Sequence, residues 1–123
     1  MNQVTLEVRD FHEGVVFYTK LGLKLIVSAR DEYARFELGS GASTLSLHVA
    51  QSPCPGNTVV YFEVDDVDQR HHLLCESGIK FDSPPTDQNW RWREARLSDP
   101  TGNKLCLYHA GPERRFPPWR IEQ

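Results

Sequence analysis

Side chains that can do chemistry alternate with apolar ones along several short segments of this sequence. Because successive side chains of a β-strand point to opposite faces, each of these segments predicts a strand with one apolar and one polar face. The polar set includes carboxylates, an imidazole, a guanidinium, a thiol and aromatic rings. We predict that it lines a ligand-binding site made of Gln3, Thr5, Glu7, Ser46, His48, Tyr61, Glu63, Trp92, Glu94, Arg96, Cys106 and Tyr108.

The aromatic and guanidinium members of this set indicate what kind of molecule could bind. Tyr61, Trp92 and Tyr108 could stack on a planar ligand or face a cation. Arg96 offers the planar fork that suits a carboxylate or a phosphate. Trp90 precedes the same strand and could lean over the opening of the site. A polar or aromatic small molecule is therefore the expected ligand.

The remaining titratable members have structural explanations as well as chemical ones. The three glutamates could receive a cationic ligand or pair with Arg96, and an internal salt-bridge network explains them equally well. His48 is a candidate metal ligand or general base, although a strand-end histidine near solvent is the commoner case. Cys106 could be a nucleophile if a base lay beside it, but a packed, inert thiol is the simpler interpretation.

A helix and several strands must position these side chains in the first half of the chain. The alternation around Val4, Leu6 and Val8 predicts a first strand. Asp10 is typical of a helix N-cap, with Glu13 as the reciprocal partner of a capping box, and Gly22 is typical of a left-handed C-cap. Further strands are predicted at 23–28, 33–38 and 44–49, separated by polar or glycine-rich turns.

The second half of the sequence repeats this pattern at an offset of 56 residues. Asp66 then matches Asp10, and Gly78 matches Gly22. We expect a helix over 67–77, a strand beginning at 79–81, and strands at 92–97 and 104–109. Asp99-Pro100-Thr101-Gly102 is typical of a tight turn between the last two strands. The pattern predicts two copies of one β-α-β-β-β unit, the alternative being a chance match of two ordinary halves.

Composition excludes several classes of protein. The chain has 123 residues, 25% of them charged, and a formal net charge of −3, which is typical of a globular protein without a nucleic-acid-binding surface. No apolar run approaches the ~20 residues of a membrane span, and no secretion signal is apparent. The three cysteines lack metal-binding spacing and suggest reduced thiols. We therefore expect a cytoplasmic protein.

Three motifs resemble a known family. VTLEVRD followed after five residues by VFYTKLGLKL, FEVDDVD, and DPTGNKLCLY together are similar to the vicinal oxygen chelate superfamily, which includes glyoxalase I, methylmalonyl-CoA epimerase, extradiol dioxygenases and bleomycin resistance proteins. The resemblance covers about residues 3–108. It implies an α+β fold of two βαβββ modules whose curved sheets surround a cleft. It also implies one glyoxalase-like domain over 1–123, with modules at 1–50 and 57–110, a linker at 51–56, a tail at 111–123, and a homodimer.

The enzymes of this family hold a divalent metal with four side chains, and the resemblance assigns those positions to Gln3, Ser46, Val59 and Cys106. Gln3 could serve as a ligand. Val59 has no donor atom, and Ser46 is a poor substitute for a carboxylate or an imidazole. Cys106 could bind zinc as a thiolate, but Gln3 and Cys106 do not complete a site. The sequence therefore predicts neither a metal nor another cofactor.

Three functions are compatible with these features. The first is a metal-free small-molecule binding protein whose ligand lies in the cavity between the modules. The second is a glyoxalase-, epimerase- or dioxygenase-like enzyme with a rearranged divalent-metal site, such as a lactoylglutathione lyase-like lyase or a dioxygenase. The third is a cofactor-free lyase or isomerase with a glutamate base. In each case we expect the partner to be a small molecule, and we expect no binding to nucleic acid or to a membrane.

The end of the chain carries large apolar side chains in a proline-rich segment. Phe116, Trp119 and Ile121 are unusual in a disordered tail. We expect the tail to pack across a groove, either over the mouth of the cavity or onto a second chain. A frayed terminus is the alternative.

Overall fold

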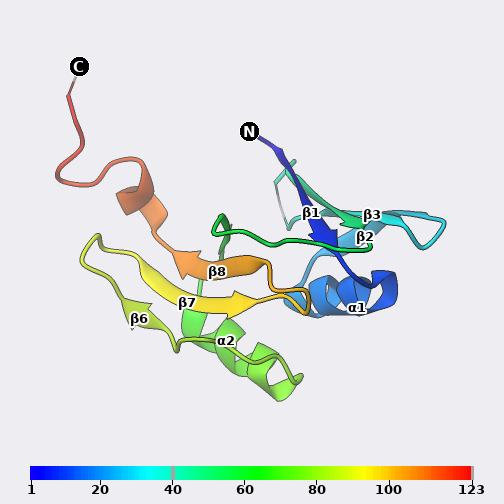
Figure 1. Cartoon of the computed structure of the whole chain (residues 1–123). Helices are drawn as coiled ribbons and strands as arrows, with labels where there is room; N and C mark the ends of the chain where they lie inside the picture. The colour runs from blue at the N-terminus through cyan, green and yellow to red at the C-terminus, as the bar shows by residue number, and fades with distance from the viewer. Residues whose placement is uncertain (40, 123) are drawn as a thin grey trace. The chain divides into compact units, whose positions relative to one another are not determined.

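A computed structural model describes residues 1–39 and 41–122 (Figure 1). The chain divides into two compact units. Unit 1 comprises Met1–Thr58 with Ser98–Lys104, and unit 2 comprises Val59–Leu97 with Leu105–Gln123. Within the described residues, no helix is both long and apolar enough to cross a bilayer.

Unit 1 is a four-stranded sheet with one helix packed against it, as Figure 1 shows. The strand order is β1-β4-β3-β2, in which β1 and β4 are parallel and the other neighbours are antiparallel. Its elements are β1 (Gln3–Val8), α1 (Phe11–Leu21), β2 (Lys24–Ala29), β3 (Tyr33–Glu37) and β4 (Thr44–Val49).

Helix α1 begins and ends where its sequence predicts. The Asp10 carboxylate accepts a hydrogen bond from the Glu13 backbone N–H at 2.8 Å, and Gly22 has a left-handed φ of 109°. The prediction that the Glu13 side chain completes a capping box is wrong, because its carboxylate pairs with Arg9 at 3.0 Å. A β-carbon on Gly14 would lie 3.0 Å from Leu47, so glycine lets α1 approach the sheet closely.

Unit 2 repeats the arrangement of unit 1. Its sheet has the order β5-β8-β7-β6, which matches β1-β4-β3-β2 strand for strand. Asp66 caps the helix as Asp10 does, accepting from the Gln69 backbone N–H at 3.0 Å. The predicted repeat is therefore confirmed. The elements are β5 (Val59–Glu63), α2 (Val67–Glu76), β6 (Thr86–Asp87), β7 (Arg93–Ser98), β8 (Lys104–His109) and a 3₁₀ helix, η1 (Gly111–Arg114).

One strand of the second unit lies later than predicted. The segment 79–81 forms only an isolated bridge between Phe81 and Leu97, and the edge strand is the two-residue β6. Pro84 and Pro85 lie between them. Proline has no N–H to donate to a ladder, so a strand starting at Ile79 cannot continue through this segment.

A buried carboxylate organises the turn that connects β7 to β8, which belongs to unit 1. Asp99 is 4% exposed. One of its oxygens accepts from the backbone N–H groups of Thr101, Gly102 and Asn103 at 3.0, 2.9 and 2.9 Å. The other accepts from the Tyr18 hydroxyl at 2.7 Å and from the Asn103 side chain at 2.8 Å. The predicted turn is confirmed, with Gly102 at a φ of 108°.

Helix α1 supplies the hydroxyl that completes this shell. Tyr18 is fully buried, and burial together with the Asp99 charge raises the pKa of its hydroxyl. The hydroxyl therefore stays protonated and acts as a donor to Asp99. The bond joins residues 81 positions apart in sequence, so it fixes the turn on the helix.

Replacing Tyr18 by Phe removes this donor and leaves a buried carboxylate oxygen short of one partner. We expect Tyr18→Phe to lower the free energy of unfolding by about 1–3 kcal/mol in urea denaturation. Tyr61→Phe, which removes a half-exposed hydroxyl, is the control and should change it by less than about 0.5 kcal/mol. Equal effects of the two substitutions would contradict this role for Tyr18.

Candidate functional site

The polar face of the first sheet is a hydrogen-bonded network centred on Ser46. Its hydroxyl is fully buried, accepts from the Gln3 amide at 2.9 Å and bonds to the Tyr33 hydroxyl at 2.7 Å. The Arg35 guanidinium donates to the Tyr33 oxygen at 2.9 Å. The hydrogen bond with Ser46, aided by Arg35, lowers the pKa of Tyr33.

The network combines predicted site residues with others that the sequence analysis did not single out. Gln3 also donates to Thr5 at 3.1 Å and accepts from Thr44, so β1, β3 and β4 all contribute side chains to the network. Tyr33 and Arg35 were missed, although their alternation with Ala34 and Phe36 is the same signal that identified the others. Paired positions across a sheet share a face, and Arg35 is the partner of Ser46 in the β3–β4 ladder.

Glu7 and His48 lie on the same face but outside the network. They are direct partners in the parallel β1–β4 ladder, and both side chains are exposed. Among the described residues, neither side chain has a hydrogen-bond partner. This is the environment of a solvent-facing histidine, which was the simpler expectation for His48.

Three aromatic rings pack together on the second sheet. Trp92 and Tyr108 have centroids 4.9 Å apart, and Tyr61 meets Tyr108 edge-on at 5.4 Å. Tyr108 is buried and Trp92 is half-buried, whereas Tyr61 is 40% exposed. Trp92 and Tyr108 thus form the less exposed part of an aromatic cluster, and Tyr61 is its most exposed ring.

Glu94 is the most deeply buried carboxylate of the second sheet, at 2% exposure. One oxygen accepts from the Trp90 indole N–H at 2.9 Å, and the other accepts from the Arg96 guanidinium at 3.1 Å. The same Arg96 nitrogen donates to the Tyr61 hydroxyl at 3.0 Å. A row of side chains therefore runs Trp90–Glu94–Arg96–Tyr61, and of the three glutamates only Glu94 pairs with Arg96.

Trp90 and Arg96 are the exposed parts of this row. Trp90 is 43% exposed and the Arg96 side chain 40%. The Arg96 guanidinium carbon also lies 5.5 Å from the centre of the Tyr61 ring, a cation–π distance. The row presents two aromatic rings and one cation: the buried Glu94 carboxylate binds Trp90 and Arg96, and Arg96 binds Tyr61.

Glu63 has a different role from Glu94. One of its oxygens accepts from the backbone N–H groups of Ala110 and Gly111 at 2.8 and 2.9 Å. Arg114 lies 4.0 Å from the other oxygen. The carboxylate therefore anchors the segment that follows β8.

The Cys106 side chain is fully buried, and the charges of Glu94 and Arg96 act on its thiol. Burial raises the pKa of its thiol to about 12, and the nearby Glu94 charge adds to the effect. A thiol in this environment is protonated near neutral pH, and only the thiolate is a good nucleophile or metal ligand.

The hairpin that carries Trp90 contains a strained residue. Arg91 has a φ of 66°, a conformation that favours glycine. Its guanidinium lies 3.2 Å from the Glu113 carboxylate and 5.9 Å from the Trp119 ring. Contacts with the C-terminal segment thus accompany the strained backbone next to Trp90.

The C-terminal segment does not bury its large apolar side chains within this chain. Phe116, Trp119 and Ile121 are 59%, 55% and 80% exposed. The segment folds on itself, with the Arg120 side chain bonded to the Arg115 carbonyl oxygen at 2.6 Å. Packing of the tail over a ligand site or onto a second chain therefore stays a prediction.

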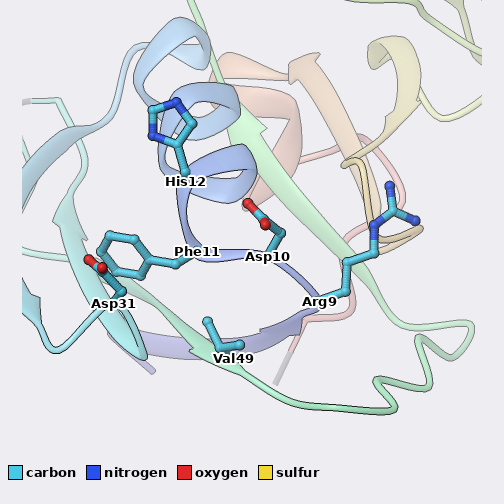
Figure 2. A pocket seen from close by; sticks show the side chains of 6 residues that line it. All are labelled: Arg9, Asp10, Phe11, His12, Asp31 and Val49. Atoms are coloured by element: carbon cyan, nitrogen blue, oxygen red, sulfur yellow. The ribbon is translucent and has the colours of Figure 1, made fainter.

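Unit 1 has a hollow of about 440 Å³ that the sequence analysis did not predict (Figure 2). It lies at the start of α1, and its lining mixes charges of both signs with apolar groups. Asp10 is occupied as the helix cap, and Arg9 is paired with Glu13. The lining residues are Arg9, Asp10, Phe11, His12, Asp31 and Val49.

Comparison with known proteins identifies the family. Residues 1–107 match the Glyoxalase/Bleomycin resistance protein/Dioxygenase superfamily. The chain belongs to this superfamily. The resemblance inferred from the three motifs is therefore confirmed, as is the α+β fold of two βαβββ modules.

The alignments of this superfamily member with individual relatives span most of both chains. It is 30% identical over 121 residues to the uncharacterized protein YraH of Bacillus subtilis (strain 168), spanning 86% of this chain and 94% of that protein. A solved glyoxalase/bleomycin resistance protein/dioxygenase from Nocardioides is 28% identical with a TM-score of 0.73, covering 89% and 82%. A bleomycin-binding protein complexed with bleomycin shares the fold, at 22% identity and a TM-score of 0.74, covering 89% and 97%.

Each unit of this superfamily member contains two of the four positions that the resemblance assigns to metal ligands. In unit 1, the Gln3 amide and the Ser46 hydroxyl bond to each other. In unit 2, Val59 offers no side-chain donor, and Cys106 is the buried thiol described above. Within the described residues, no three His, Cys, Asp or Glu side chains are grouped to hold a metal ion.

The raised pKa of Cys106 predicts selective labelling of the native protein. At pH 8 a thiol reagent such as dithionitrobenzoate should label the exposed Cys54 and Cys75 rapidly, and Cys106 only after unfolding. Because the folded pKa lies above the unfolded value, the contribution of this thiol to stability is full below about pH 8.5 and is lost as pH rises toward 12. Rapid labelling of a Cys54→Ser/Cys75→Ser variant would contradict this state of Cys106.

The strain at Arg91 predicts different stabilities for two substitutions that both remove its side-chain contacts. Arg91→Ala keeps a β-carbon at positive φ, whereas Arg91→Gly relieves the strain. We expect Arg91→Gly to be more stable than Arg91→Ala by about 1 kcal/mol in thermal unfolding. Equal stability of the two variants would show that the left-handed backbone is not strained.

Proposed function

We propose that this superfamily member is a small-molecule binding protein that works without a metal. The ligand is polar or aromatic and binds on the polar face of β5, β7 and β8. The observation that carries this proposal is the row Trp90–Glu94–Arg96–Tyr61, in which the buried carboxylate binds the Trp90 indole and the Arg96 guanidinium, and the guanidinium binds the Tyr61 hydroxyl. Side chains ordered before binding lose less entropy when the ligand arrives.

The residues at the family's metal positions support binding without a metal. The Val59 side chain has no lone pair, the Cys106 thiol is protonated near neutral pH, and the Ser46 hydroxyl is a weak donor to a divalent ion. These positions therefore do not fit a divalent metal. Arg96 instead provides the positive charge beside the buried Glu94 carboxylate.

A relative of the same fold supports the binding of an organic molecule. The structure of a bleomycin-binding protein complexed with bleomycin shows that this fold can hold such a ligand. The alternative, a glyoxalase-, epimerase- or dioxygenase-like enzyme with a rearranged metal site, has no grouping of donors within the described residues to favour it.

The expected homodimer and cytoplasmic location stay predictions. Strand β2 is the edge of the first sheet, and its Leu25, Ile26 and Val27 are 38%, 44% and 36% exposed. An open edge with apolar side chains supports pairing with a second chain.

Metal analysis and ligand-dependent melting test the proposed function together. Elemental analysis of protein purified without chelators should find no stoichiometric divalent ion. One or more compounds of a panel of aromatic and polar metabolites should raise the melting temperature by several degrees, since a ligand that binds only the folded state stabilises it. A stoichiometric metal ion that is needed for this shift would contradict the proposal.

Substitution of Arg96 locates the binding site. Arg96→Ala should abolish the melting shift and leave the circular dichroism spectrum unchanged. Lys24→Ala is the matched control, because it removes an exposed cation on β2 and should preserve the shift. A shift that survives in Arg96→Ala would assign Arg96 a structural role only.

A further inference from the structure

On the polar face of the second sheet, the carboxylate acceptors are occupied, whereas several donor N–H groups are not. Both oxygens of Glu94 already accept hydrogen bonds, and Glu63 is occupied with backbone N–H groups. Arg96 uses only one of its three nitrogens, Nη2, for its two bonds. Nε and Nη1 have no acceptor among the described residues, so three N–H groups of Arg96 stay available.

The exposed surfaces of the row suit the binding of a planar aromatic molecule. Tyr61 and Trp90 each have about two fifths of their surface exposed, and both are fixed through the same ion pair. The guanidinium is planar and can stack on an aromatic ring as well as donate hydrogen bonds at its edge. A ring that lies over this row would meet aromatic surface and cationic donors together.

We infer that the ligand of this site is an aromatic carboxylate. Its ring packs on the exposed Tyr61 and Trp90 side chains, and its carboxylate accepts hydrogen bonds from Nε or Nη1 of Arg96. Charge-assisted bonds of this type are about twice as strong as those between neutral groups. The inference rests on the proposed function and adds the chemical class of the ligand to it.

A cationic aromatic ligand fits these residues less well. Its positive charge would lie beside Arg96, and the one carboxylate of the row is buried and has both oxygens occupied. A neutral aromatic ligand would pack on the rings but would offer the Nε and Nη1 donors of Arg96 only an uncharged acceptor, which forms weaker hydrogen bonds.

Three probes that share one ring system separate these possibilities. We would measure the affinities of 2-naphthoate, 2-naphthamide and 2-naphthamidinium for the full chain by isothermal titration calorimetry. The carboxylate should bind at least about tenfold more tightly than the amide, and the amidinium should bind most weakly. Equal affinities, or tighter binding of the amide or the amidinium, would overturn the inference about ligand class and leave a small-molecule site in place.

Variants of the row show whether Arg96 causes the preference. Arg96→Met keeps an apolar stem and should bring the affinities for carboxylate and amide within about twofold of each other. Tyr61→Leu should weaken both by a similar factor, because it removes ring surface and keeps the cation. Lys24→Ala should leave all three affinities unchanged.

Results that rule out an aromatic carboxylate as the ligand differ from results that rule out small-molecule binding altogether. If the preference for the carboxylate survives in Arg96→Met, the inference is wrong although a ligand binds. If none of the three probes binds the parent protein, the inference is also overturned. The proposed function itself then depends on the metal analysis and on the wider melting panel.

Discussion

The buried Asp99 carboxylate is the constraint on which the rest of the first unit depends. It accepts five hydrogen bonds, three from the backbone of its own turn and two from the side chains of Tyr18 and Asn103. Asn103 in turn donates to the Glu7 carbonyl oxygen at 2.9 Å. A single carboxylate thereby connects the turn, helix α1 and the end of β1. A buried anion is stable only when it is paired in this way.

Glu94 follows the same physical rule with a different result. Its desolvation is also offset by hydrogen bonds, but its donors are the half-exposed side chains of Trp90 and Arg96. Ordering a carboxylate beneath the surface therefore orders the groups above it. Cys106, at one of the four positions that the resemblance assigns to metal ligands, adds a neutral thiol to this region. A second carboxylate there would require a further cation.

The sequence was sufficient for the features that depend on local chemistry. Alternation predicted the strands, Asp10 and Asp66 predicted the helix starts, and Gly102 predicted the turn. The offset between the halves predicted two copies of one β-α-β-β-β unit, and the two sheets have matching strand orders. These signals repeat within a few residues and do not depend on distant contacts.

The structural features that the sequence did not predict depend on contacts between residues that are distant in the chain. Nothing near Asp99 in the sequence indicates that Tyr18 donates to it. Three glutamates were equivalent candidates for Arg96, and only tertiary packing selects Glu94. Pro84 and Pro85 displaced the edge strand beyond its predicted start, and the hollow at the start of α1 arises from three segments that are separate in sequence.

Nuclear magnetic resonance of two N–H groups tests the central claim most directly. The Trp90 indole N–H and the Arg96 guanidinium Nε–H can be assigned from the variants that remove them. On titration with 2-naphthoate, both signals should shift together and saturate at one dissociation constant. Shifts confined to residues of the first sheet, such as the Gln3 side-chain amide, with the Trp90 and Arg96 signals unmoved, would contradict the account.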